Sequence, residues 1–139
     1  MPVSFENICT AFDFASAGGF HEHRAFLCRR TGKIYYHSDF SDLNDDLPED
    51  IEDEEKYIAL PDKREIGLGK PLALNFAREC LPDDFDEIRY IFSRRGGYKK
   101  FRVLLGKRNA LDRWYEFEKE ATDQTLRDWC RLNSINLVD

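Results

Sequence analysis

Ten of the seventeen residues from 39 to 55 are acidic, and none is basic. Repulsion between carboxylates, and the cost of burying them, keep such a segment in water. Leu43, Leu47 and Ile51 recur every four residues within it and would tie it to the rest of the fold. We therefore interpret residues 39–55 mainly as a solvated connection.

Strand signals lie on both sides of this connection. Strands are predicted over 20–29 and 34–38, joined by a tight two-residue turn, Thr31-Gly32, in which the glycine supplies a positive φ. That turn would place His37 opposite Phe26. A third strand, 56–60, ends at Pro61 and completes an antiparallel sheet.

Apolar residues recur at helical spacing before the hairpin and again after residue 70. Caps and breaks set the expected helix ends, because Ser, Asp and Asn favour N-caps, Pro favours the first helical position and Gly ends helices. The residues assigned to these roles are Ser4, Gly18-Gly19, Pro71, Asp83, Gly96-Gly97 and Asn109. The predicted fold class is α+β, with an N-terminal helix, a three-stranded antiparallel sheet and a helical C-terminal half.

The size of the chain, 139 residues, fits a single domain spanning 1–139, with the helix and strands in 1–60 and the helical part in 70–135. Apolar residues make up 42% of the chain, which supports a core without disulfides or metal. The four cysteines are scattered, and the sequence shows neither a basic leader nor a long apolar run. We expect a cytoplasmic, reduced protein with no membrane segment and no cofactor.

The helical half resembles the uncharacterised protein family numbered 0158, a group of small bacterial proteins. The residues that carry the resemblance are Gly96-Gly97-Tyr98-Lys99-Lys100-Phe101-Arg102, Trp114-Tyr115-Glu116-Phe117 and Trp129. Strand and turn residues before position 76 follow in the same order as in that family, except in the acidic connection. The resemblance implies the order of the elements and carries no catalytic residues.

Residues 94–108 hold seven basic residues and no acid, against a net charge of −6 for the whole chain. Helical spacing places the cations opposite an apolar side formed by Tyr98, Phe101, Leu104 and Leu105. Three interpretations stay open: a solvated face, a complement to the acidic connection within the chain or across a dimer, and a surface for nucleic acid or another anion. The candidate residues for binding an anion or a partner are Arg94, Arg95, Lys99, Lys100, Arg102 and Lys107.

The acidic connection supplies the matching candidate surface. Its opening resembles a calcium-binding loop at Asp42, Asn44 and Asp46, but Leu47 stands where such a loop needs Gly and Asp53 where it needs Glu. A calcium site is therefore not predicted, nor is any other metal site. The candidate residues for an acidic partner surface are Asp42, Asp45, Asp46, Glu49, Asp50 and Asp53.

Catalytic motifs do not stand out in this sequence. The Gly67-Leu68-Gly69-Lys70 stretch lacks the rest of a phosphate-binding loop, and Ser38 beside His37 is not a triad. The leading prediction is a non-enzymatic interaction domain that binds a protein partner or itself by charge complementarity. The alternatives are an RNA- or DNA-binding module that uses the basic segment, and a hydrolase whose site gathers from distant residues.

Overall fold

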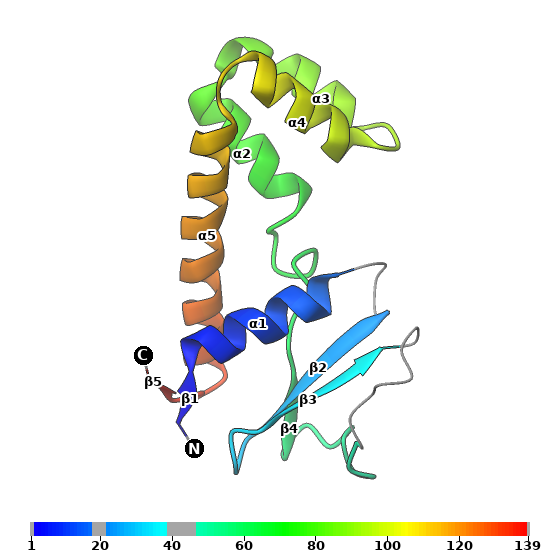
Figure 1. Ribbon diagram of the computed structural model, residues 1–139, viewed down its shortest axis with the longest axis vertical. Coiled ribbons are helices and arrows are strands. Elements are labelled where there is room, and N and C mark those ends of the chain that lie inside the picture. The colour runs from blue at the N-terminus through cyan, green and yellow to red at the C-terminus, as the bar shows by residue number, and fades with distance from the viewer. Residues whose placement is uncertain (1, 18–21, 39–46, 139) are drawn as a thin grey trace. The chain divides into compact units, whose positions relative to one another are not determined.

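The computed structural model describes residues 2–17, 22–38 and 47–138 (Figure 1). The chain divides into two compact units, which we call the sheet unit (residues 1–66 and 124–139) and the helical unit (residues 67–123). Five α-helices and a three-stranded antiparallel sheet lie in the described residues, so the predicted α+β class is confirmed. The assignment of 1–139 to a single domain stays a prediction.

The first helix of the sheet unit, α1 (Phe5–Ser16), is capped at its N-terminus. The Ser4 hydroxyl accepts a hydrogen bond from the Asn7 N–H at 3.3 Å, which confirms Ser4 as the N-cap. The helix ends at Ser16, whereas the glycine pair expected to stop it lies outside the described residues. Its buried residues recur at helical spacing and are Phe5, Ile8, Ala11, Phe12 and Ala15.

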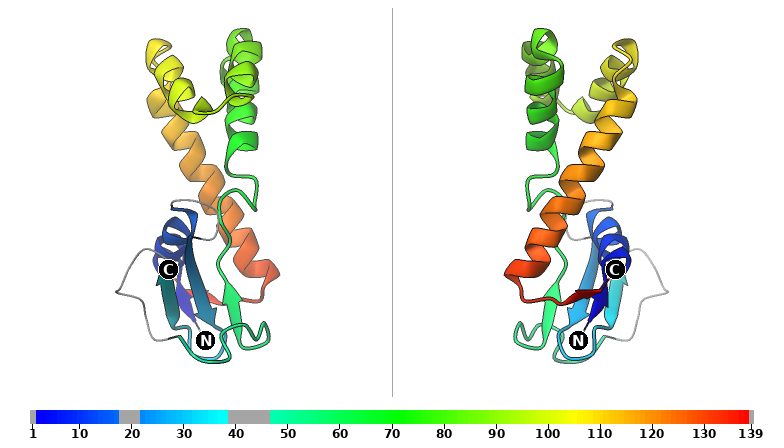
Figure 2. Two further views of the ribbon diagram at one scale, coloured as in Figure 1. Left: turned by 90° about the vertical axis from the view of Figure 1, so that its right-hand side faces the viewer. Right: turned by 90° about the vertical axis from the view of Figure 1, so that its left-hand side faces the viewer.

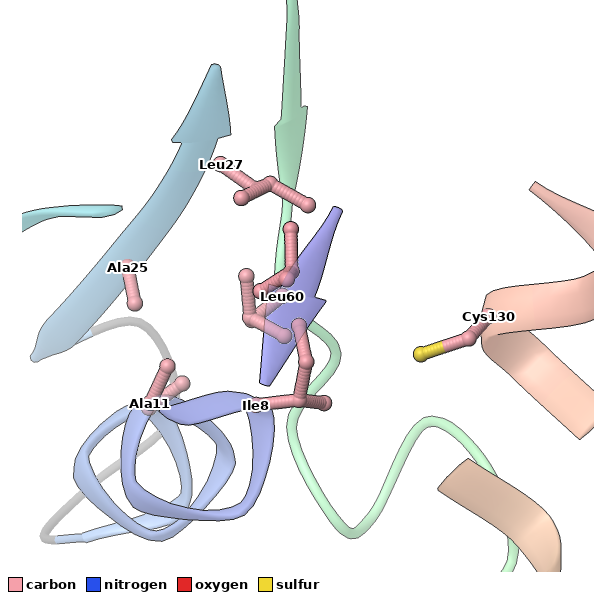
Figure 3. Close-up of a cluster of buried hydrophobic side chains, with 8 residues drawn as sticks. Ile8, Ala11, Ala25, Leu27, Leu60 and Cys130 are labelled. Carbon is pink, nitrogen blue, oxygen red and sulfur yellow. The ribbon is translucent and has the colours of Figure 1, made fainter. Parts of the chain in front are cut away.

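The sheet has the strand order β3-β2-β4, with β2 in the centre (Figure 2). Its strands are β2 (His23–Cys28), β3 (Ile34–Ser38) and β4 (Tyr57–Ala59). Helix α1 packs against the sheet over a buried apolar cluster that the last turns of α5 also join (Figure 3). The cluster includes Ile8, Ala11, Ala25, Leu27, Leu60 and Cys130.

The register of the hairpin differs from the predicted one by two residues. Arg24, and not Phe26, lies opposite His37. A four-residue loop, 29–32, replaces the expected two-residue turn, because the Cys28 N–H donates to the Lys33 carbonyl at 2.8 Å. A shift of two residues leaves each side chain on its original face, so the predicted face of every strand residue survives.

A second, two-stranded parallel sheet joins the two ends of the sheet unit and was not predicted. It pairs β1 (Val3–Ser4) with β5 (Leu137–Val138). The turn between α5 and β5 uses Ser134 at a φ of +58°, and the Ile135 N–H donates to the Cys130 carbonyl at 2.8 Å. This is the Schellman arrangement, which here ends the helix without a glycine.

The helical unit is built around Trp114, which is 1% exposed. Its elements are α2 (Lys70–Cys80), the 3-10 turn η1 (Pro82–Asp84), α3 (Phe85–Phe92), α4 (Gly97–Lys107) and the first thirteen residues of α5 (Leu111–Leu132). The rings of Phe76 and Phe101 meet Trp114 edge-on at centroid distances of 5.3 and 5.2 Å. Such pairs add about 0.5–1.5 kcal/mol beyond burial, so they fix how the helices pack.

Two of the predicted helix caps are wrong. Asp83 lies within η1, and the residue before α3 is Asp84, whose carboxylate instead binds Arg108. Asn109 has a φ of +55° and ends α4, where the Ala110 N–H donates to the Leu105 carbonyl at 2.9 Å. Asn was read as a starting residue because it favours N-caps, but it also adopts the left-handed conformation that a helix end requires.

Gly97 allows α4 to start directly against the end of α3. A Cβ at this position would lie 2.6 Å from the carbonyl oxygen of Ile91 and 3.0 Å from the Cα of Phe92. Both are backbone atoms that cannot rotate away, so we expect Gly97→Ala to lower the free energy of unfolding by about 1–3 kcal/mol in a urea titration.

Gly106→Ala is the matched control in the same helix. A Cβ there would meet only Leu111 Cδ1 at 3.8 Å, and alanine is favoured over glycine in a helix by about 0.5–1 kcal/mol. This variant should therefore be more stable than the wild type. Equal effects of the two substitutions would contradict the close approach at Gly97.

Asp84 and Arg108 form a two-pronged ion pair, with both N···O distances at 3.0 Å. The hydrogen bond from Arg108, and then its charge, lower the pKa of Asp84, while partial burial opposes the shift. A lowered folded-state pKa stabilises the protein above the unfolded value, about 3.9, and that contribution is lost as the pH falls through the folded value. We therefore expect Asp84→Asn to lower Tm at neutral pH, and the difference from wild type to shrink below about pH 4.

Asp86→Asn serves as the control for this pH experiment. Asp86 lies two residues further along the chain, in α3, but is exposed, and its ion-pair partner, Arg89, is 3.8 Å away. Exposed pairs contribute little, so its Tm should match that of the wild type across the same pH range. A Tm loss for Asp84→Asn that is constant with pH would show that the ion pair is not its cause.

Candidate functional site

Helix α4 turns its apolar side inward and its cations outward, as its sequence predicts. Phe101 and Leu105 are fully buried. The predicted candidates Lys99, Lys100, Arg102 and Lys107 are all exposed. Tyr98 departs from the prediction, because it is 40% exposed and its hydroxyl lies 3.3 Å from Glu118 and 3.4 Å from the Trp114 indole nitrogen.

Three of the predicted cations share a hollow of about 510 Å³ between α3 and α4. Lys99, Lys100 and Lys107 line it from α4, at positions that share one helix face. Its other lining residues, which sequence reasoning did not select, are Glu87, Ile91, Val103 and Leu104. Val103 is 55% exposed, so an accessible aliphatic side chain lies among three ammonium groups. We call this feature the lysine groove.

The remaining predicted cations lie outside the lysine groove. Arg102 donates to the Tyr115 hydroxyl of α5 at 3.1 Å, and Tyr115 itself is 43% exposed. Arg94 lies over the Tyr90 ring, 5.3 Å from its centroid, and Arg95 is exposed. The structure thus divides the six candidates into a group of three and three separate side chains.

The three lysines of the groove outnumber the one carboxylate among its described lining residues, Glu87. No ion pair joins Lys99, Lys100 or Lys107 to a carboxylate in the part of the chain that the structure describes. By contrast, Arg108 on the same helix is held by Asp84. An anionic group would therefore be attracted to the lysine groove without displacing a described partner.

The acidic candidates divide into described and undescribed residues. Asp42, Asp45 and Asp46 lie outside the described residues, so their prediction stays untested. Asp50 binds Lys56 at 2.8 Å, and the Asp53 carboxylate accepts the Glu55 N–H at 3.0 Å. The hydrogen bond from Lys56 lowers the pKa of Asp50.

Part of the acidic connection is thus engaged within its own unit. Besides Asp50 and Asp53, Glu52 meets Arg24 at 3.5 Å. Glu49 is exposed. These contacts brace the turns between 47 and 56, and leave only some of the carboxylates for an external partner.

Two of the four cysteines have shifted pKa values. All four are free thiols. Burial raises the pKa of Cys130 to about 11. Burial acts in the same direction on Cys28, but hydrogen bonds from the Thr31 hydroxyl and from the Thr31 and Arg30 N–H groups give a net lowering of its pKa.

The surroundings of Cys28 do not complete a catalytic site. The hollow of about 520 Å³ that it lines contains Arg29, Arg30, Asp50, Glu55, Lys56 and Tyr57. None of these described residues is a histidine that could act as its base. Among the residues that the structure describes, no group of three or more His, Cys, Asp or Glu could hold a metal ion.

Comparisons with known proteins add no function to this geometry. No family model, no curated protein and no solved structure matches the chain. The resemblance to the family numbered 0158 stays an expectation from the motif residues. None of the described helices is both long and apolar enough to span a membrane.

Proposed function

We propose that this protein is a non-enzymatic interaction domain that binds an acidic protein segment in the lysine groove, either on another protein or on a second copy of the chain. The observation that carries the proposal is the placement of exposed Val103 among Lys99, Lys100 and Lys107. Lysines attract carboxylates, while an aliphatic floor favours apolar side chains. A segment that offers both, such as an amphipathic acidic helix, matches the groove.

The floor of the groove favours a protein over a nucleic acid. Its exposed apolar group, Val103, is aliphatic, whereas bases bind by stacking on aromatic rings or arginine. Tyr98 and Tyr115 are hydrogen-bonded to neighbouring side chains, and Tyr90, which is 60% exposed, lies beneath Arg94 outside the groove. Nucleic acid binding through Arg94, Arg95, Lys99, Lys100 and Arg102 is therefore the second candidate, and the experiment below distinguishes it.

The distribution of charge supports a second copy as one source of the acidic segment. The sheet unit contains seventeen acidic and nine basic residues, whereas the helical unit contains ten acidic and twelve basic residues. Opposite signs on two units favour association between copies at low salt. The Asp42, Asp45 and Asp46 carboxylates are among those that could contribute.

The same proposal places this interaction in the cytoplasm and the chain in the family numbered 0158. Four free cysteines are consistent with the reducing environment of a cytoplasm. Membership of the uncharacterised family numbered 0158 is proposed from the Gly96-to-Arg102 and Trp114-to-Phe117 motifs. Neither statement assigns a reaction, and the proposed function involves no cofactor.

The test compares two charge reversals of equal size. The probe is a fluorescent, acidic amphipathic helical peptide with leucines along one face and glutamates elsewhere, titrated with the protein at low salt. Lys99→Glu with Lys107→Glu alters the groove, whereas Arg94→Glu with Arg95→Glu changes the net charge equally outside it. We expect the first pair to weaken binding at least about tenfold, since exposed charge contacts contribute up to about 1 kcal/mol each.

Three further measurements complete this test. Val103→Ser should weaken binding of the peptide without a change in the charge of the protein. A peptide of the same composition, with its leucines scattered around the helix, should bind poorly. Sedimentation of the protein alone at low and high salt reports association between copies. Equal losses for both charge reversals, or tighter binding of a single-stranded oligonucleotide than of the peptide, would contradict the proposal and favour nucleic acid.

A further inference from the structure

Strand β4 leaves one edge of the three-stranded sheet open. The Leu60 N–H donates to the Ala25 carbonyl at 2.8 Å, and the Arg29 N–H donates to the Lys56 carbonyl at 2.9 Å. In an antiparallel pair the backbone groups of successive residues alternate in direction. Residues 56, 58 and 60 therefore face β2, while the backbone groups of Tyr57 and Ala59 point away from the sheet.

Most of the outward-pointing backbone groups of Tyr57 and Ala59 have no hydrogen-bond partner within the described residues. The Tyr57 N–H donates a hydrogen bond to the Asp53 carbonyl at 2.9 Å. The Tyr57 carbonyl and both backbone groups of Ala59 have no hydrogen-bond partner in the described part of the chain, and Ala59 is exposed. Proteins usually protect such an edge with lysine, proline or a covering element, because it is a template for another strand. The three residues of β4 include neither lysine nor proline, although Lys56 precedes the strand and Pro61 follows Leu60.

Two hollows lie along this edge. The first, of about 360 Å³, is lined by Phe26, Tyr57 and Ile58 among others, and the second, of about 280 Å³, by Leu60 and Pro61 among others. Arg24, Ala59 and Trp129 line both hollows. Trp129 belongs to the end of α5, which lies in the sheet unit. The open edge of β4 thus faces the end of α5 across a space that extends along the strand on both sides of Ala59.

We propose that β4 binds an extended segment of a partner protein as an added fourth strand, between β4 and the end of α5. Backbone groups of the segment would pair with Ala59 and with the Tyr57 carbonyl, and its alternate side chains would enter the two hollows beside Trp129. Strand addition of this kind takes affinity from main-chain hydrogen bonds and specificity from pockets for alternate residues. This site is separate from the lysine groove and does not depend on the proposed function.

The charge around the edge defines the chemistry of the segment. The sheet unit has eight more acidic than basic residues. The two cations that line the hollows are already used, because Arg24 meets Glu52 at 3.5 Å and Arg29 donates to the Glu54 carbonyl at 3.1 Å and to the Asn133 carbonyl at 3.2 Å. The occupant that fits is therefore a strand-forming segment with apolar, β-branched residues at alternate positions and basic residues at its ends.

The test begins with a phage-displayed library of random linear peptides, selected on the intact wild-type protein. Selected peptides are compared by fluorescence anisotropy on Ala59→Pro and on the matched variant Ala59→Val. Proline removes the Ala59 N–H and is tolerated on an open edge, whereas valine keeps the N–H and favours a strand. We expect binding to Ala59→Pro to be at least about tenfold weaker than binding to Ala59→Val, which enlarges the same side chain at the hollows but keeps the N–H.

A second measurement uses only the wild-type protein, so that it holds even where Ala59→Pro unfolds. Two analogues of a selected peptide carry N-methyl groups on alternate sets of residues. Only every second N–H of an added strand faces β4, so one analogue should lose binding and the other should keep it. Failure to select basic, alternating peptides, or equal binding of both analogues, would overturn the proposal.

Discussion

The packing of Trp114 against Phe76 and Phe101 is the interaction on which the candidate surface depends. Phe101 is fully buried and lies at 5.2 Å from the Trp114 ring, so this contact fixes which side of α4 faces inward. The opposite side then carries the lysines by geometry alone, since residues at helical spacing share a face. A charge surface on α4 is thus a consequence of aromatic packing, and Gly97 sets how closely α3 approaches it.

Ion pairs in this protein are mostly local, and that locality decides which charges stay available. Asp84 holds Arg108, Asp50 holds Lys56 and Asp62 holds Arg64, each within one unit. The hydrogen bond from Arg64 likewise lowers the pKa of Asp62. Asp50 and Lys56 are six residues apart and Asp62 and Arg64 two, so these two pairs form at little entropic cost, whereas Asp84 and Arg108, 24 residues apart, meet through the packing within the helical unit. Charges without such a neighbour, as on the outer face of α4, are the ones left to act on other molecules.

Sequence reasoning predicted the elements that depend on local chemistry and missed those that depend on tertiary contacts. Ser4 capped its helix as expected because an N-cap needs only the three residues after it. The role of Asn109 was reversed, because the same residue type serves both helix ends and only the position of α4 against α5 decides between them. Likewise the lysines were predicted, whereas Val103 was not, because its exposure depends on how α3 packs beside α4.

Binding at the two candidate surfaces depends on different interactions, so a partner that used both would respond to salt differently at each. Attraction to the lysine groove is electrostatic between exposed groups, so it weakens as the Debye length falls to about 8 Å at physiological ionic strength. Hydrogen bonds at the edge of β4 form between neutral backbone groups and respond little to salt. A partner that carried an acidic helix and a basic strand would therefore bind the helical unit in a salt-dependent way. The main-chain hydrogen bonds between the partner's strand and β4 would persist at high salt. The two sites would therefore differ in salt dependence within a single complex.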